Sequence, residues 1–172
     1  MFESIYKVLE DAQKLDQEEI AYDCYFDEDF QTIVINSNRI GQLTAGEDVN
    51  GGIVGTYSPN TDIMSEGLTF SFEGQNYEKI VGEPYNFVDS GDFFRSFRII
   101  VQNDGFIIYA NDQKVDGSLS EKFNAELLGL NDENIKRMVE ALLPIFIRET
   151  RRVITLIKEK ERKRRAPYPQ NN

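Results

Sequence analysis

The side chains that could do chemistry in this 172-residue chain are few in kind, because histidine is absent and Cys24 is the only cysteine. Without histidine, Ser-His-Asp and Cys-His triads, imidazole bases and histidine-ligated metals are excluded. A single cysteine allows neither an internal disulfide nor a cysteine-based zinc site. We expect Cys24 to be a small core residue. Catalysis would therefore depend on carboxylates, lysines, tyrosines and hydroxyls.

The main catalytic hypothesis rests on four acidic residues, which we call the acidic cluster: Asp23, Asp27, Glu28 and Asp29. Carboxylates can bind Mg²⁺, and Lys79 or Lys114 could complete a nuclease-like site. However, no Asp/Glu-x-Lys pattern follows a recognisable strand, and carboxylates on an exposed helix face also serve solubility. The glycine-rich residues 46–55 contain no phosphate-binding motif, and residues 48–51 match only part of a calcium loop. We therefore predict no catalytic, cofactor-binding or metal-binding residues.

The net charge of −11 is unevenly distributed along the chain. Residues 148–165 contain nine basic and three acidic residues and carry +6, so the remainder of the chain carries −17. This division indicates a basic segment that binds an acidic surface on a neighbouring subunit, a partner or nucleic acid. A solvated helix end is the alternative, because cations also stabilise a helix C-terminus. The candidate interaction residues of this segment are Arg151, Arg152, Lys158, Arg162, Lys163, Arg164 and Arg165.

The elements that would position these groups begin with a helix over residues 2–18, where apolar side chains recur every three or four positions. A second helix is expected over about 27–36, with a strand over 32–35 as the alternative because β-branched residues cluster there. Residues 41–67 are rich in glycine, asparagine and aspartate, so we expect a long connection with turn chemistry. Such long connections usually have a function. This one would be an arm that reaches a neighbouring subunit or, in an enzyme, a lid.

The clearest local signal is a β-hairpin over residues 98–110. Two β-rich runs flank Asp104-Gly105, a pair that suits a two-residue type I′ turn. The predicted register pairs Asn103 with Phe106.

Weaker signals surround this hairpin. Alternating apolar residues predict a strand over 68–72, and a turn over 73–76 would lead into a second strand over 77–81. Asp89 or Ser90 is expected to cap a short helix before the hairpin, and another short helix is expected over residues 118–128.

The final helix is predicted to begin after the capping residue Asn131 and to run over about 132–164, with an apolar stripe as far as Ile157. Its length would be roughly 50 Å at 1.5 Å per residue. A small domain has a diameter nearer 30 Å, roughly the length of a 20-residue helix. Part of the helix should therefore project or bend, and Pro144 is the expected bend.

Together these elements predict one α+β domain, with a small antiparallel sheet, flanking helices and a long C-terminal helix. The body would comprise residues 1–130, with the arm at about 41–67. The long helix would comprise 131–165, and 166–172 would form an extended tail. The chain has no apolar run long enough for a membrane span and no secretory signal pattern, so we expect a soluble intracellular protein.

Several short motifs resemble those of one family of proteins. Their residues are Asn36, Gln42-Leu43, Gly46, Asp48, Asn50-Gly51, Ile53, Gly55, Tyr57-Ser58, Val88-Asp89-Ser90-Gly91-Asp92-Phe93, Ser96, Lys114 and Leu128-Gly129-Leu130. They resemble small virion-morphogenesis and head–tail joining proteins of tailed bacteriophages, in particular those of Bacteroidota and crAss-like phages. The family usually has Asp-Thr-Gly where this chain has Asp89-Ser90-Gly91. Lysines often follow the tyrosine in the family, and this chain lacks those lysines. The resemblance covers roughly residues 30–130.

This resemblance implies a neck, connector-ring or tail-completion component without enzymatic activity. We therefore expect a structural virion protein, assembled in the host cytoplasm, whose copies form a ring that joins portal and tail around the DNA channel. Its partners would be other copies of itself and portal, adaptor or tail proteins. Tyr57 joins the basic residues as a candidate interaction residue, and the basic segment could also contact DNA non-specifically. The alternatives are a metal-dependent phage nuclease that uses the acidic cluster and an acidic regulatory binding protein.

Overall fold

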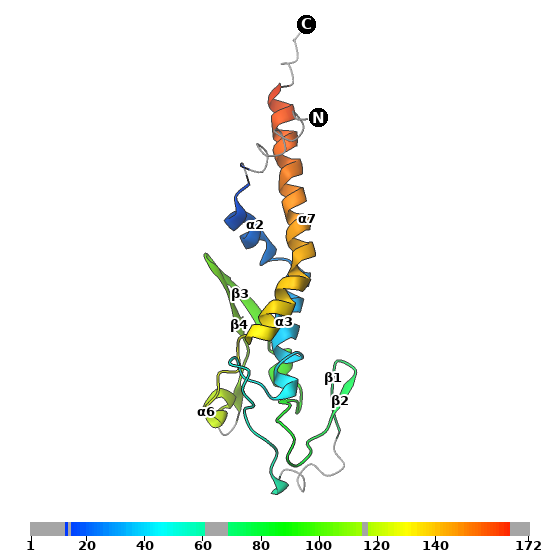
Figure 1. The fold of residues 1–172 in the computed structure, drawn as a ribbon, viewed down its shortest axis with the longest axis vertical. Coiled ribbons are helices and arrows are strands. Elements are labelled where there is room, and N and C mark those ends of the chain that lie inside the picture. Colours follow the sequence, from blue (N-terminus) through cyan, green and yellow to red (C-terminus); the bar gives the residue numbers. More distant parts are fainter. Residues whose placement is uncertain (1–12, 14, 61–68, 115–116, 166–172) are drawn as a thin grey trace.

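The computed structural model describes residues 13, 15–60, 69–114 and 117–165. It combines helices with short antiparallel strands, so the predicted α+β class is confirmed. The long C-terminal helix is also present, and its C-terminal part projects beyond the rest of the described chain (Figure 1). In chain order the elements are α2 (Gln17–Cys24), α3 (Glu28–Arg39), the 3₁₀ helix η1 (Leu43–Ala45), β1 (Phe70–Phe72), β2 (Gln75–Tyr77), α5 (Asp92–Arg95), β3 (Arg98–Gln102), β4 (Gly105–Tyr109), β5 (Gln113–Lys114), β6 (Gly117–Ser118), α6 (Leu119–Phe123) and α7 (Asp132–Arg165).

The described strands form three separate two-stranded antiparallel sheets, β1–β2, β3–β4 and β5–β6. The turn between β1 and β2 is Glu73-Gly74, and both residues adopt positive φ, at 48° and 77°. This conformation suits the right-handed twist of a tight hairpin. The second strand therefore begins at Gln75, and the predicted strand over 77–81 is wrong in its position.

The hairpin β3–β4 exists as predicted, but its register differs. Gln102 pairs with Gly105, so the two-residue turn is Asn103-Asp104 and not Asp104-Gly105. Positive φ is not adopted by Asn103, Asp104 or Gly105, so the expected type I′ turn does not form. The shift of two positions keeps each side chain on its expected face, because side chains alternate with a period of two.

Two short helices flank the hairpin, both close to where they were predicted. Before β3, Gly91 is the N-cap of α5, so the cap predicted at Asp89 or Ser90 lies too early in the chain. The Ser90 hydroxyl accepts a hydrogen bond from the Asp92 amide at 3.4 Å. After β6, α6 is shorter than the predicted helix over 118–128, because Asn124 adopts the left-handed conformation and ends it.

The helix α2 was not predicted from the sequence pattern. Residues 15 and 16 are not helical, and α2 starts after Asp16, whose carboxylate accepts hydrogen bonds from two amides of the first turn. The predicted helix over 2–18 therefore ends too late; its other residues lie largely outside the described part. By contrast, α3 confirms the helix expected over about 27–36, with Asp27 as its N-cap.

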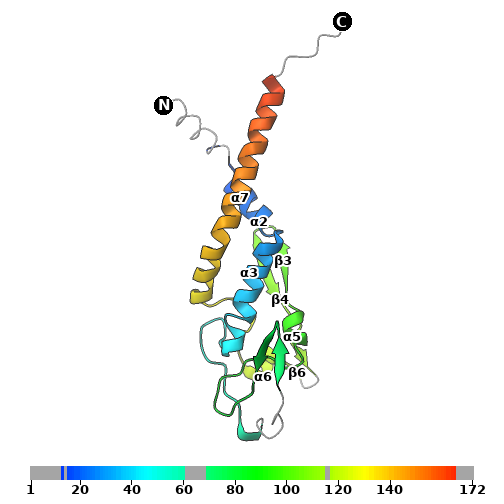
Figure 2. The same ribbon diagram turned by 90° about the vertical axis from the view of Figure 1, so that its right-hand side faces the viewer.

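The apolar core has two parts. The lower part lies among the short strands and α5, and it centres on the fully buried Phe94 with Phe93 and Phe97 beside it. The upper part lies where α2, α3 and α7 meet, and it includes Cys24, Val34 and Ile145. Figure 2 shows α3 between α7 and the hairpin, so α3 connects the two parts.

The described portion of the predicted arm lies against its own chain. Residues 47 and 53 form one isolated bridge, and residues 56 and 57 form two more with 84 and 81. The Val49 amide donates to the carbonyl of Glu126 at 3.1 Å. Residues 41–60 of the predicted arm therefore contact the body of their own chain, and residues 61–67 lie outside the described part.

Candidate assembly interface

The N-terminus of α7 is fastened to the body by a buried amide network. The Asn131 side chain caps the helix, because its oxygen accepts from the Asn134 amide at 2.9 Å. Its side-chain NH₂ donates to Glu47 at 2.8 Å, and its backbone N–H donates to the buried Gln42 at 2.9 Å. The predicted cap is thus confirmed, and Gln42 and Glu47 give the helix a defined direction away from the body.

The inner face of α7 packs on α2 and α3. Ile145 is buried against Phe30 and Val34, with Met138 and Leu142 partly buried beside them. These α7 positions recur every three or four residues, which places them on one side of the helix.

The acidic cluster forms ion pairs with this same helix. Arg148 donates to Asp27 and lies 3.7 Å from Asp29, while Arg152 donates to Asp23 at 2.9 Å. The carboxylate of Asp27 raises the pKa of the Arg148 guanidinium above its ordinary value. These contacts tie α2 and the start of α3 to the middle of α7.

This arrangement does not assemble the nuclease-like site considered above. Within the described ranges, no three acidic or cysteine side chains are grouped closely enough to hold a metal ion. Lys79 donates to Asp89 at 3.1 Å, and Lys79 and Lys114 line a pocket that contains none of the acidic cluster. The two lysines are therefore not brought to Asp27 or Asp29.

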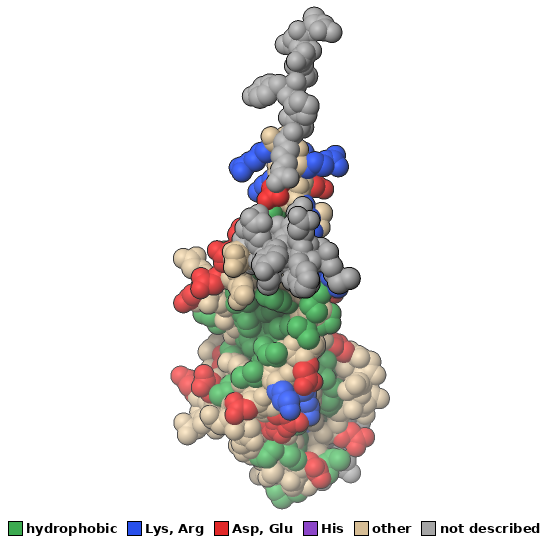
Figure 3. All heavy atoms as spheres, turned by 45° about the horizontal axis from the view of Figure 1, so that its top comes forward, with side chains coloured by type: hydrophobic (Ala, Val, Ile, Leu, Met, Phe, Trp, Pro, Cys, Tyr) green, Lys and Arg blue, Asp and Glu red, His purple; other side chains and the backbone are tan. Residues whose placement is uncertain are grey.

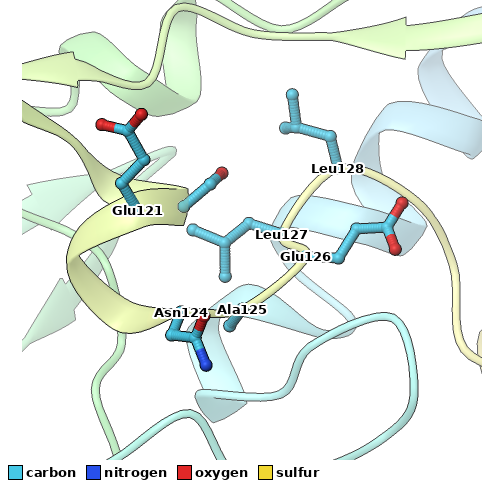
Figure 4. A pocket seen from close by; sticks show the side chains of 7 residues that line it. Glu121, Asn124, Ala125, Glu126, Leu127 and Leu128 are labelled. Carbon is cyan, nitrogen blue, oxygen red and sulfur yellow. The ribbon is translucent and has the colours of Figure 1, made fainter.

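A hollow of about 600 Å³ beside α6 also lacks a catalytic arrangement. Leu127 lies at its centre, and the carboxylates of Glu121 and Glu126 lie on opposite sides of it (Figure 4). Because these polar groups do not converge on one point, the hollow offers no acid–base pair.

Cys24 is buried, as expected of a core residue, with 4% of its surface exposed. Burial and then the negative charges of Glu149, Asp27 and Asp23 raise the pKa of its thiol. A raised pKa disfavours the reactive thiolate.

The outer face of α7 carries a second apolar surface. We call it the apolar stripe and define it as Ile135, Val139, Leu143, Phe146 and Ile147, which are 38–57% exposed. The helix continues unbroken through Pro144, so the stripe lies along one continuous element. Sequence periodicity identified an apolar stripe on α7 but did not separate its buried side from this exposed one.

A shallow groove of about 450 Å³ connects the apolar stripe to the hairpin. Ile107 of β4 and Ile135 of α7 both line it. The outward face of the hairpin adds the exposed Ile100 and Tyr109. Figure 3 shows hydrophobic side chains gathered across the middle of the molecule, below the basic end of α7.

The basic residues occupy the projecting end of α7. Arg162, Lys163 and Arg164 are exposed there, and Figure 3 shows basic side chains on both sides of the helix. Arg151 and Lys158 are exposed as well, whereas Arg152 is held by Asp23 and Glu149. Arg165 is the last residue of the helix. The basic residues therefore surround the helix end and do not form one flat face.

Tyr57, the remaining candidate interaction residue, is largely buried, unlike the basic candidates on α7. It is 7% exposed, and its hydroxyl donates to the Asn86 side chain at 3.0 Å and accepts from the Asn86 amide at 3.1 Å. Its partner is 29 residues away in the chain, so the sequence pattern held no signal for this contact.

Among the described residues, no helix is long and apolar enough to cross a membrane. No protein-family model matches the chain, and the searches of curated proteins and of solved structures give no match.

Proposed function

We propose that this protein is a non-enzymatic structural protein whose copies assemble through the apolar stripe of α7. The observation that carries the proposal is the exposure of five large apolar side chains along one continuous helix. Contiguous exposed apolar surface of this kind marks interaction sites in soluble proteins.

Charge favours a second copy as the partner. Each chain has an acidic body over residues 1–130, which carries −16, and a basic helix end over residues 148–165, which carries +6. When copies pack side by side, the basic end of one helix can lie against the acidic surface of the next subunit, which steers association and fixes register. A head-to-tail contact of this type closes into a ring when the rotation between copies permits it.

The finer proposal is a ring in the neck or tail-connector region of a tailed phage, which joins portal and tail around the DNA channel. The motif resemblance over residues 30–130 supports this assignment. Exposed Arg162, Lys163 and Arg164 would contact either the next subunit or the DNA that passes through the ring.

Sedimentation velocity of the full chain over a wide concentration range tests the assembly. We expect discrete oligomers that persist at about 500 mM salt, because apolar contacts are not screened as charges are. A monomer at every concentration, without binding to portal or tail components, would contradict the proposal. Mass spectrometry of purified particles tests the location, and detection at several copies per particle is the expected result.

A further inference from the structure

A pocket of about 260 Å³ is lined by α6 and by the segment before α5. Figure 2 shows α6 far from the projecting end of α7. Its apolar wall is aromatic. The rings of Tyr85 and Phe123 have centroids 4.8 Å apart, and those of Phe87 and Phe123 are 5.3 Å apart. All three rings are partly exposed.

Lysines surround this aromatic wall. Only six basic residues occur between positions 15 and 130, and three of them, Lys79, Lys114 and Lys122, line this pocket. One acid, Asp89, lines it as well and accepts from Lys79. Among the lining residues that the structure describes, three are therefore basic and one is acidic, within a strongly acidic body.

The aromatic wall is held in place from behind. The Asn86 side chain accepts from Tyr57 and from the Val88 amide, both at 3.0 Å, and donates to the carbonyl of Glu78 at 2.9 Å. Phe87 adopts φ 54°, a left-handed conformation that is strained for a bulky side chain. Strain of this kind persists where the surroundings impose it, and it occurs often at ligand clamps.

We propose that this pocket binds a short acidic segment of a partner protein, with one aromatic side chain inserted against Phe87 and Phe123 and carboxylates paired with Lys114 and Lys122. The volume is slightly below the roughly 300–1,000 Å³ of small-molecule sites, and it suits a single large side chain. The preformed wall lowers the entropic cost of binding.

A short segment fits better than a nucleic acid. A polynucleotide presents a phosphate at every residue, and those beyond the pocket would meet a body that carries −16 over residues 1–130. An acidic peptide presents only a few carboxylates, and these can be placed at the lysines. The pocket contains none of the residues of the apolar stripe, so the inference does not depend on the proposed function.

Fluorescence anisotropy of the full chain with a labelled peptide, acetyl-Asp-Glu-Phe-Glu-Asp-amide, tests this inference. Saturable binding below about 1 mM is expected. Replacing the peptide phenylalanine with alanine should weaken binding at least about tenfold, since the aromatic anchor is lost. The double variant K114E/K122E should also weaken it at least about tenfold, because it repels the peptide carboxylates.

Lys136→Glu is the matched control, because Lys136 is exposed on α7 and does not line the pocket. This variant should keep the affinity within about twofold. Circular dichroism of each variant verifies that the fold is retained. Absence of binding, equal binding of the alanine peptide, or equal loss in K136E and K114E/K122E would each overturn the inference. Tighter binding of a single-stranded oligonucleotide that K114E/K122E abolishes would do so too, because it would assign the pocket to nucleic acid.

Discussion

Replacement of Leu143 by glutamate should disrupt self-association without unfolding the chain. Leu143 is 57% exposed, so about half of its surface remains to be buried in a contact between copies. Full burial of a leucine contributes about 1.5–3 kcal/mol, so roughly 1–1.5 kcal/mol would be lost. Burying a carboxylate without a partner costs at least about 2 kcal/mol more. The association constant should therefore fall by about 10² to 10³, at 1.4 kcal/mol per factor of ten.

Sedimentation equilibrium over a dilution series measures this association constant. Ala141→Glu is the matched control, because it introduces the same charge at an exposed position outside the basic helix end and about 160° round the helix from Leu143. We expect A141E to associate like the natural chain, and both variants to retain its free energy of unfolding within about 0.5 kcal/mol. If L143E is correctly folded and still associates with unchanged affinity, the apolar stripe is not the interface.

Three further predictions concern the body. Gly41→Ala should lower the free energy of unfolding measured in urea titrations. The added Cβ would lie 2.6 Å from the Asn134 side-chain oxygen and 2.7 Å from the Ser37 carbonyl oxygen. Gly105→Ala is the control and should be close to neutral, because its Cβ would meet nothing within 4 Å. Hydrogen bonds from Ser90 and Arg95 lower the pKa of Asp92 in the folded chain. The stabilising contribution of Asp92 should therefore be present above its ordinary pKa of about 3.8 and be lost as the pH falls through the lower pKa of the folded state. Asp92→Asn should remove this acid dependence of the free energy of unfolding. Cys24 should resist alkylation in the folded protein and react after unfolding, as mass spectrometry would record; rapid modification of the folded chain would contradict its burial.

Local signals were sufficient for several elements of the fold. Capping residues carry much of this information, because a short polar side chain satisfies the free amides of the turn that follows it. Asn131 marked the start of α7, and the apolar spacing indicated a helix as far as Ile157. By contrast, α2 escaped prediction because it buries only Ile20 and Cys24, too few apolar positions for a helical period to be recognised.

The candidate site shows the same division. The sequence alone excluded histidine chemistry and separated a basic helix end from an acidic body, because both conclusions depend only on composition and order. It could not assign the acidic cluster, whose partners Arg148 and Arg152 lie 121 and 129 residues away from Asp27 and Asp23. Nor could it tell which apolar residues of α7 face the body and which face outward, since a helix has one period but the docking of α2 and α3 selects the buried side. Only the tertiary structure decided that the acidic cluster pairs with α7 and that the apolar stripe remains exposed.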